Sequence, residues 1–435
     1  MPACSGSGAS PAPRAHLPSA RAAELIGTRL LNVLVRAPAR TRLRVSGVLR
    51  GPAGGSASLG AAKARGVGHG RWQAIEVPIT RSGLTALGAC SHSRVVATVR
   101  ASDQSSTVSR ALGLGPPDCS RFFRSRSFWN QPLTRGARLD PDSAAVSKEL
   151  MRRVQAGYGS GQPPTINTSA FTPPVVAVPA NQARVRVQLD RPPGDAPELA
   201  AAFQAVPLPS SARPASGSDG ELVLWQPASD TLWEFWQLRR ANDGWHASWG
   251  GRLRHVQNGP GEYPDPRLSW GTAASGLPLA GGLILPHELR QGEIRHVLAL
   301  GVPSIRARYF ASPAQRTDGA SVCRHAPVEG ARFRLDPNLN IDSLKLPRPV
   351  AILARAAQRY GIVLRDQSGA VAFYAQNSST LARDPYPALF GYKPAAQLLT
   401  RFPWARLKLV RMHLNQMSGP PNHLPGVPDL LRPCG

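Results

Sequence analysis

Short runs of alternating apolar and polar residues, separated by turn-forming residues, constrain the fold of this chain more than any other feature. In the run RLRVSGVLR the apolar residues Leu43, Val45 and Leu49 are separated mainly by polar ones, and WQAIEVPIT and RVVATVRAS repeat the pattern. A period of two places such side chains on one face of a β-strand. Strand-like runs follow one another through Gly, Pro and Ser turns rather than through crossover helices, which favours antiparallel sheets.

The order of these runs predicts three segments. Residues 1–22, rich in Ser, Ala, Gly and Pro, are expected to form a disordered tether. Residues 23–114 predict a small Ig-like β-sandwich that acts as a spacer or adhesion module. Residues 120–435 predict a larger antiparallel β-sandwich or jelly roll with a few appended helices, of which PRPVAILARAAQRYG, ended by Gly361, is one. The predicted fold class is therefore mainly β.

The chain is strongly basic, with 52 Lys and Arg against 26 Asp and Glu and a net charge of +26. The arginines are spread from Arg14 to Arg432, whereas nucleic-acid-binding proteins usually gather them in one patch. Together with abundant Ala, Gly and Pro, this excess fits a GC-rich genome; the alternative is a preference for an anionic partner. We therefore expect a monomer with no nucleic-acid partner. No window reaches the ~18 apolar residues that a membrane span needs.

The five cysteines include no CxxC pair and no metal-ligand spacing. In an exported protein four of them can form two disulfides, and Cys119 with Cys434 is the first pair to test; isolated thiols are the alternative. The first twenty residues lack the apolar core of a signal peptide, although Ala3 and Cys4 before a Ser/Gly/Pro/Ala stretch look like the end of a lipoprotein signal. We expect a secreted or cell-surface protein, with lipid on Cys4 as one alternative.

The segment DTLWEFWQLRRANDGWHASWGG, residues 230–251, holds four of the nine tryptophans and predicts a hairpin with a tight turn at Asp243 and Gly244. On its first strand Glu234 and Trp236 share one face. A carboxylate beside an indole suits a sugar, whose C–H face stacks on the ring. A structural glutamate paired with an arginine is the alternative. The tryptophans assigned to substrate binding are Trp225, Trp236, Trp245 and Trp249.

Candidate catalytic groups follow from two possible reactions on a polysaccharide. Hydrolysis needs two carboxyl groups roughly 5–10 Å apart, one with a raised pKa, and Glu234 with Asp318 is the leading pair. Elimination on a uronic-acid polymer needs a base, such as His246, His296 or a tyrosine, and arginines for the substrate carboxylate. His296 is most simply a buried strand histidine, which leaves its catalytic role as the less favoured interpretation.

Three further residues are assigned to substrate binding. Arg316 and Arg334 can each clamp an acidic group through two hydrogen bonds, although either is equally explained as a surface arginine. Asp366 either contacts the substrate or only initiates a turn. The sequence contains no GxGxxG at a strand–helix junction, no Walker A loop, no HExxH and no GxSxG. We therefore expect no metal and no cofactor.

Several sequence blocks between Phe128 and Trp404 are similar to those of an uncharacterised family of exported proteins common in high-GC soil actinobacteria. The blocks are SFWNQPL, DTLWEFWQLRR, GWHASWGG, LPLAGGL, EIRHVLALGV, PAQRTDG, GARFRLDP and QRYGIVLRDQSG. The resemblance implies export and this domain order, with an Ig-like spacer before the main domain. It implies no mechanism, because the family has no established activity. The missing signal peptide is a departure from the family.

These observations predict an exported carbohydrate-active protein that cleaves an extracellular polysaccharide, as a hydrolase or a lyase, in a Trp-lined cleft. A non-catalytic glycan-binding or cell-wall-attached protein would use the same tryptophans without chemistry. A polyanion or nucleic-acid binder is the second alternative, and its affinity would fall by orders of magnitude between ~50 and 200 mM salt.

Overall fold

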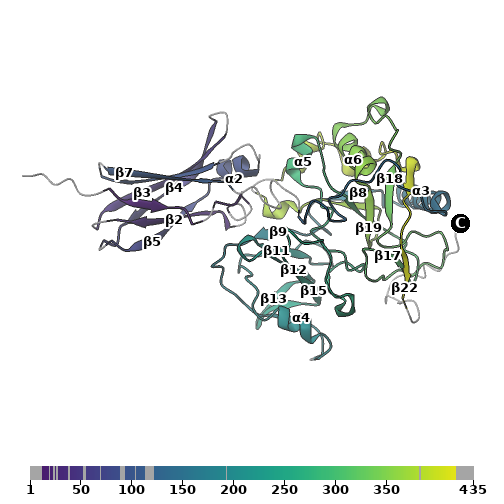
Figure 1. Ribbon diagram of the computed structural model, residues 1–435, viewed down its shortest axis with the longest axis horizontal. Helices are drawn as coiled ribbons and strands as arrows, with labels where there is room; N and C mark the ends of the chain where they lie inside the picture. Colours follow the sequence, from purple (N-terminus) through teal and green to yellow (C-terminus); the bar gives the residue numbers. More distant parts are fainter. Residues whose placement is uncertain are drawn as a thin grey trace, which may run out of the picture. The chain divides into compact units, whose positions relative to one another are not determined.

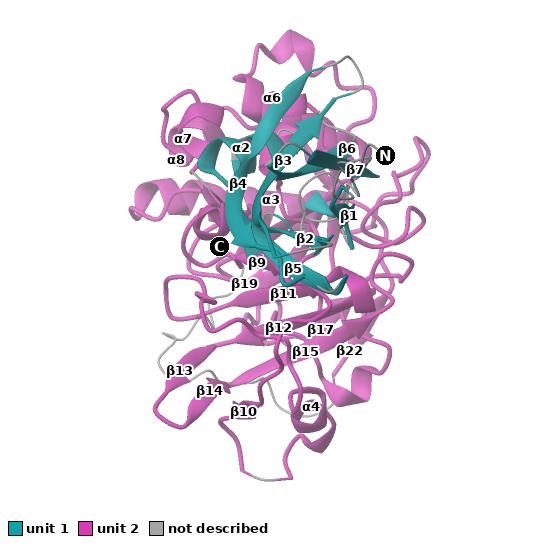
Figure 2. Ribbon diagram, turned by 90° about the vertical axis from the view of Figure 1, so that its left-hand side faces the viewer, with its two compact units in different colours: residues 1–120 teal, residues 121–435 magenta. Residues whose placement is uncertain are grey.

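The computed structural model divides into two compact units, Met1–Ser120 and Arg121–Gly435 (Figure 2). It describes residues 12–417 apart from 19, 23–24, 26–27, 38–39, 52–54, 69, 89–93, 103, 113–121, 193 and 382–383. Within these residues the fold is mainly β, with several antiparallel sheets and few helices, which confirms the predicted fold class. No helix in the described part of the chain is long and apolar enough to cross a membrane.

Unit 1 is a sandwich of two antiparallel sheets, with strand orders β1-β2-β5 and β4-β3-β6-β7 (Figure 1). The elements are β1 (Arg14–His16), β2 (Leu30–Arg36), β3 (Arg42–Arg50), β4 (Ser56–Arg65), β5 (Trp72–Pro78), α2 (Arg81–Gly88), β6 (Arg94–Ala101) and β7 (Gln104–Ala111). As the alternation predicts, Leu43, Val45 and Leu49 of β3 point inward and are at most 2% exposed. The predicted tether is wrong for residues 14–16, because β1 pairs with β2.

Unit 2 contains two larger sheets and two small ones. The larger sheets have the orders β15-β12-β11-β9 and β21-β18-β19-β16-β20-β8, and the small ones β10-β14-β13 and β17-β22. The strands are β8 (Thr165–Asn167), β9 (Val175–Ala177), β10 (Val187–Leu189), β11 (Leu222–Gln226), β12 (Thr231–Trp236), β13 (Arg239–Ala241), β14 (Gly244–Ala247), β15 (Trp249–Arg254), β16 (Leu298–Val302), β17 (Tyr309–Ala311), β18 (Arg332–Leu335), β19 (Ile362–Gln367), β20 (Ala372–Tyr374), β21 (Leu407–Leu409) and β22 (Leu414–Gln416).

The sheets of unit 2 also include parallel pairs. Strands β16 and β19 run parallel, as do β20 and β8, and β11 and β9. Alternation within a single strand cannot predict such pairs, because they join segments far apart in the sequence. A jelly roll therefore stays a prediction for this unit.

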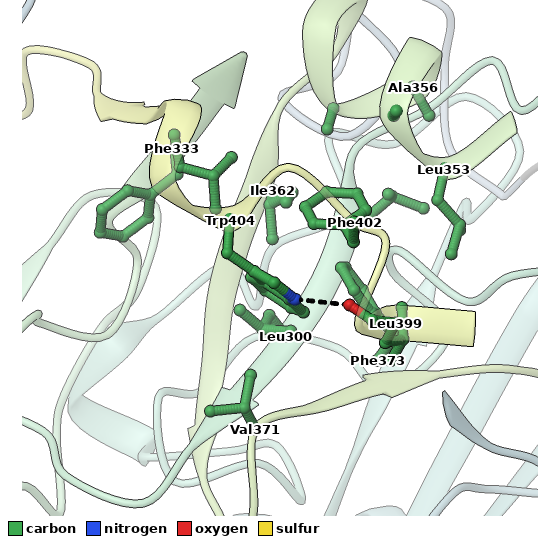
Figure 3. Close-up of a cluster of buried hydrophobic side chains, with 14 of the residues drawn as sticks. Leu300, Phe333, Leu353, Ala356, Ile362, Val371, Phe373, Leu399, Phe402 and Trp404 are labelled. Atoms are coloured by element: carbon green, nitrogen blue, oxygen red, sulfur yellow. Dashed lines mark hydrogen bonds between the residues drawn. The ribbon is translucent and has the colours of Figure 1, made fainter. Parts of the chain in front are cut away.

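Short helices accompany the sheets of unit 2. They are α3 (Ser143–Gly159), α4 (Pro197–Ala202), α5 (Pro286–Gln291), α6 (Arg348–Arg359), α7 (Tyr386–Leu389) and α8 (Ala395–Leu399). Helix α6 packs on β16 and β18 (Figure 1), and Gly361, with φ 87°, follows its C-cap as predicted. Aromatic rings fill the core of the six-stranded sheet, where Trp404 stacks on Phe373 and donates a hydrogen bond of 3.0 Å to the Leu399 carbonyl (Figure 3).

The Trp-rich segment forms a hairpin that is divided between two sheets. Trp236 of β12 lies opposite Trp249 of β15, and Ala241 of β13 lies opposite Gly244 of β14. The turn is therefore Asn242 and Asp243, one residue earlier than predicted. Gln237 has a φ of 52°, which interrupts the strand, so that β13 and β14 join a separate sheet with β10. Sequence alternation does not reveal such a break.

Only one cysteine falls within the described residues. Cys323 is 1% exposed and disulfide-bonded. The cysteine that is bonded to Cys323 lies outside the described residues. Cys4 and the predicted pair of Cys119 and Cys434 lie outside them too.

Candidate functional site

Five carboxyl groups gather in the interior of unit 2 around a connecting loop, residues 270–281. We call this group the acidic cluster, and its members are Glu221, Glu234, Asp318, Glu329 and Asp366. The larger sheets supply Glu234 from β12 and Asp366 from β19, two strands that Figure 1 shows in different sheets. Glu221 lies directly before β11, and Asp318 and Glu329 lie in the connection between β17 and β18. The fold thus brings together carboxyl groups from segments almost 150 residues apart.

Three members of the cluster lie close enough to coordinate one ligand. One carboxylate oxygen from each of Asp318, Glu329 and Asp366 lies within 4.8 Å of the others. Glu329 is 0% exposed, whereas Asp318 and Asp366 are partly exposed. Of the three residues, the two aspartates are therefore the ones with surface in contact with solvent.

Members of the acidic cluster differ in their partners, since Glu234 and Asp366 accept backbone hydrogen bonds, that to Asp366 from the N–H of Ala274 at 3.2 Å. None of the five takes part in an ion pair among the described residues. Both Oε atoms of Glu329 and Oδ1 of Asp318 are buried without a hydrogen-bond partner. Thr317 lies close enough to Glu329 to favour its ionised form, but forms no hydrogen bond of normal geometry with it. Unpaired buried carboxylates are costly, which favours a functional explanation over a structural one.

Burial changes the protonation of these three groups to different degrees. It raises the pKa of Asp318 to about 6, against the opposing effect of the Arg316 charge. Burial, together with the charge of Asp318, raises the pKa of both Glu329 and Asp366 well above their ordinary values. Burial therefore raises the pKa of all three acids, and at Asp318 the charge of Arg316 opposes the rise. Environments that separate the pKa values of neighbouring acids are typical of acid–base catalysis.

Glu234 and Glu221 form the inner part of the cluster. Glu234 is 0% exposed and accepts hydrogen bonds from the backbone N–H groups of Thr272 (2.9 Å) and Leu279 (2.8 Å). Burial nevertheless raises the pKa of Glu234 above its ordinary value. Burial also raises the pKa of Glu221 to about 7, although the charge of Arg365 opposes this shift. Glu234 thus ties β12 to the connecting loop.

Two arginines, Arg316 and Arg365, supply positive charge close to the acidic cluster. Arg316 donates hydrogen bonds to the carbonyls of Trp270, Gly271 and Ala273 at 2.8–3.0 Å, which fixes the start of the connecting loop. Arg365 donates to the Leu279 carbonyl, while its Nε and Nη2 have no hydrogen-bond partner. Two positive charges therefore offset five acids without pairing directly with any of them.

Tyr263 lies beside Glu234 because the facing strand has no side chain there. Gly251 of β15 pairs with Glu234, and a Cβ at Gly251 would approach the Tyr263 ring to 2.6 Å. The Tyr263 hydroxyl lies near the Glu234 carboxylate but forms no hydrogen bond of normal geometry with it. A larger residue at Gly251 would displace this ring from the site.

The predicted Trp-lined trough with an exposed Glu234 is wrong. Glu234 is fully buried, because its face of β12 packs against the connecting loop rather than solvent. Trp225 and Trp245 are also core residues, at 1% and 7% exposed. Trp236 and Trp249 are half-buried and lie opposite each other, with Arg191 stacked 4.7 Å over the Trp249 ring. These two indoles are the part of the trough that solvent reaches.

The two histidines do not belong to the acidic cluster. His246 is held between Asp190 (3.1 Å) and Asp243 (2.9 Å) on the small β10-β14-β13 sheet. His296 is 4% exposed and contacts Glu288 Oε2 (3.1 Å) and the Val297 carbonyl (2.8 Å). Both ring nitrogens of each histidine are thus engaged elsewhere, so the prediction of either as the catalytic base is wrong for this site.

The two arginines predicted to bind substrate lie in different parts of unit 2. Arg316 lies at the cluster, whereas Arg334 is 3% exposed and donates to the carbonyls of Thr134, Leu335 and Gln358. Arg334 therefore has a structural role, and its prediction as a substrate clamp is wrong. Sequence analysis singled out Asp318, Asp366, Glu234 and Arg316, but it missed Glu329 and Glu221. Glu221 directly precedes β11 in DGELVL, and Glu329 lies three residues before the start of β18 in VEGARF; only their burial distinguishes them from ordinary turn acids.

The three close carboxyl groups also fit a metal ion. Calcium prefers carboxylate and carbonyl oxygens at about 2.3–2.6 Å, so ligands on opposite sides of the ion lie roughly 5 Å apart. The separations among Asp318, Glu329 and Asp366 fall within that range. The expectation of no metal, drawn from motif spacing, thus does not follow from the geometry.

Comparisons with known proteins add little to this description. No family model and no curated protein matches the chain. The crystal structure of Bacteroides uniformis beta-glucuronidase is 13% identical over 37% of this chain and 20% of its own, with a TM-score of 0.13. A calcium-binding mutant of Bacteroides uniformis beta-glucuronidase 2 is 11% identical over 39% and 20%, with the same TM-score. The chain thus spans about a fifth of either structure, and neither likeness carries an argument.

Proposed function

We propose that unit 2 is a carbohydrate-active enzyme that hydrolyses a glycosidic bond with Asp318 and Asp366. The observation that carries the proposal is the close group of Asp318, Glu329 and Asp366, which forms no ion pair among the described residues and in which Asp318 Oδ1 and both Oε atoms of Glu329 lack a hydrogen-bond partner. Glycoside hydrolysis requires two neighbouring carboxyl groups, of which one is protonated and the other ionised at the working pH. The half-buried Trp236 and Trp249 give a sugar ring apolar surface on the face of β12 that also carries Glu234.

In the proposed reaction the two aspartates have different roles. Asp366, whose pKa is raised by burial, donates its proton to the glycosidic oxygen as the bond to the anomeric carbon breaks. Ionised Asp318 attacks that carbon and forms a glycosyl ester. Asp366, now ionised, removes a proton from water, which hydrolyses the ester and restores both groups. The separation within 4.8 Å is close to the 5–5.5 Å or so typical of retaining enzymes, so the product keeps its anomeric configuration.

Glu329 and Arg316 support this assignment without contacting the substrate. The charge of Arg316 lowers the pKa of Asp318 and so favours its ionised form. Burial and the charge of Asp318 raise the pKa of Glu329, which disfavours a third negative charge beside the two aspartates. Elimination is less well supported, because His246 and His296 are engaged outside the cluster.

The test uses a panel of neutral and acidic polysaccharides, with product detection by reducing-end assay and mass spectrometry. Asp318→Asn and Asp366→Asn should each lower kcat/KM at least about 10³-fold, because each removes one partner of the proton transfer or attack. Asp342→Asn is the matched control, since Asp342 is 79% exposed and pairs with Arg355. Full activity in either cluster variant would contradict the proposal. An inverted product, detected by NMR, would contradict the role of Asp318 as nucleophile.

A second candidate function is cation-dependent glycan binding at the same carboxylates. It is favoured by the two unpartnered oxygens of Glu329, which suit a divalent cation as well as a proton. Under this alternative, millimolar calcium raises the Tm of the wild type, and Asp318→Asn abolishes the increase. Activity that persists in a chelator without any calcium-dependent Tm change would favour acid–base hydrolysis.

Export to an oxidising compartment is part of the proposal. Its support is the disulfide of Cys323, because disulfides persist mainly outside the cytosol. The sequence resemblance to exported actinobacterial proteins points the same way. Mass spectrometry of the protein from its native cells, with and without reduction, tests the bond, and fractionation tests the location.

A further inference from the structure

Unit 1 has a basic surface on the outer face of its four-stranded sheet. The register of β4-β3-β6-β7 places outward residues of one strand directly beside those of the next. Seven basic residues point outward and are exposed. We call them the basic face, and they are Arg42, Arg44, Arg50, Lys63, Arg65, Arg94 and Arg100. Figure 1 shows β3, β4 and β7 together in one layer of unit 1, with β2 and β5 in the other.

Like charges face each other across the strands of this sheet. Arg44 lies between Lys63 of β4 and Arg100 of β6, and Arg42 lies opposite Arg65. Directly opposed like charges destabilise a sheet, and an acid at one position of each pair would relieve the repulsion. Such an arrangement is expected where the positive charge serves to bind a partner.

No acid compensates this charge within the sheet. The four strands contain neither Asp nor Glu, although the whole chain has 26. Apart from Arg50, no member of the basic face forms an ion pair with any described residue. A random distribution of arginines from a GC-rich genome would not remove acids from the same face.

The spacing of the charges leaves a polar strip between two basic ends. Arg44 and Arg50 on β3 are six residues apart, which is roughly 20 Å along a strand. Between them lie Ser46, Thr98 and Thr107, whose hydroxyls share one row across the sheet. A hollow of about 500 Å³, lined by Arg40, Thr41, Arg42, Arg65, Gly66 and Val67, lies at one end of the face. Charges that alternate with hydroxyls suit a polymer with both carboxylate and hydroxyl groups.

We propose that the basic face of unit 1 binds a carboxylated polysaccharide. Arginine guanidinium groups pair with carboxylates through two parallel hydrogen bonds, and the central hydroxyls bond to sugar hydroxyls. Nucleic acid is a poorer match, because the four strands contain no aromatic residue on which a base could stack. The flat sheet also presents no helix or ribbon that could enter a duplex groove.

The test measures binding of full-length protein to labelled polygalacturonate by fluorescence anisotropy at 50 and 200 mM NaCl. Every protein carries Asp366→Asn, so that cleavage in unit 2 cannot remove the probe and the proposed activity does not affect the result. The face variant combines Arg44→Gln, Lys63→Gln and Arg100→Gln. The control variant combines Arg401→Gln, Arg406→Gln and Arg411→Gln, three exposed arginines of unit 2, and removes the same charge.

The face variant should lose at least tenfold in affinity at 50 mM NaCl and show a weaker salt dependence, while the control variant loses less than twofold. Neutral dextran should not bind. Equal losses in the two variants, or no binding of polygalacturonate at 50 mM NaCl, would overturn the proposal. Tighter binding of a DNA duplex than of polygalacturonate, lost in the face variant, would assign the basic face to nucleic acid instead.

Discussion

The basic face of unit 1 and the acidic cluster of unit 2 both gather like charges, but one lies in solvent and the other in the protein interior. On the basic face, water and salt screen the repulsion over about 8–10 Å. In the acidic cluster burial opposes ionisation and raises the pKa of Glu329 and Asp366. The location of the charges thus favours a binding role for unit 1 and a proton-transfer role for unit 2.

Glu221→Gln offers the sharpest test of the acidic cluster, because it removes a buried charge and keeps the shape. The pKa of Glu221 is raised from 4.5 to about 7, so the native state binds this proton more tightly than the unfolded state. The resulting loss of stability is absent below pH 4.5 and complete above about pH 7, where it is on the order of 3 kcal/mol. We expect Glu221→Gln to raise the free energy of unfolding at pH 8 by that order, as measured by urea denaturation, and to have little effect at pH 4.

Glu149→Gln should have the opposite sign, although Glu149 is equally buried at 5% exposed. Burial opposes its ionisation, but the hydrogen bonds and charges of Arg152 and Arg153 outweigh burial and lower its pKa. Its stabilising effect is therefore present above pH 4.5 and lost as pH falls through the lowered pKa. We expect Glu149→Gln to lower the free energy of unfolding at pH 8 by about 2 kcal/mol. If both variants changed the free energy of unfolding in the same direction, the acidic cluster would not differ from other buried glutamates in its effect on stability.

The pH dependence of cleavage reports on Asp318. Because this group must be ionised to attack, log kcat/KM should rise with pH and level off above about pH 6. We call this rising part of the pH profile the acidic limb. In Arg316→Gln the acidic limb should move to higher pH, since the Arg316 charge favours the ionised form of Asp318. Arg316→Lys keeps the charge and should keep the limb near its original position. An unchanged limb in Arg316→Gln would show that Arg316 acts only through its hydrogen bonds to the connecting loop.

The smallest effect is expected on the basic face. Arg44→Gln removes the charge between Lys63 and Arg100, so it should stabilise unit 1 by about 0.5 kcal/mol at 20 mM NaCl. The gain should vanish near 1 M NaCl, where the Debye length is about 3 Å. Thermal unfolding at the two salt concentrations measures it. A gain that persists at 1 M NaCl would show that repulsion is not its cause.

Sequence patterns predicted the fold class and part of the candidate site. Alternation correctly placed Leu43, Val45 and Leu49 inside unit 1, because each strand face is decided by neighbours two residues apart. Residue type suggested Asp318 as a catalytic acid, but Asp366 was predicted only to bind substrate or to initiate a turn. The role of Glu234 was predicted wrongly, because either face of β12 fits the same alternation, and the connecting loop decided which face is buried.

The sequence by itself determined many of the strands, the helix that Gly361 ends and the excess of positive charge, since these depend on local spacing and composition. Only the tertiary structure decided that Glu329 lies beside Asp318 and Asp366, and that Arg44 lies between Lys63 and Arg100. Both arrangements depend on strand pairing and loop packing between distant segments. Burial and proximity, which set the pKa of an acid and the repulsion between two arginines, are properties of that packing rather than of the residues in order.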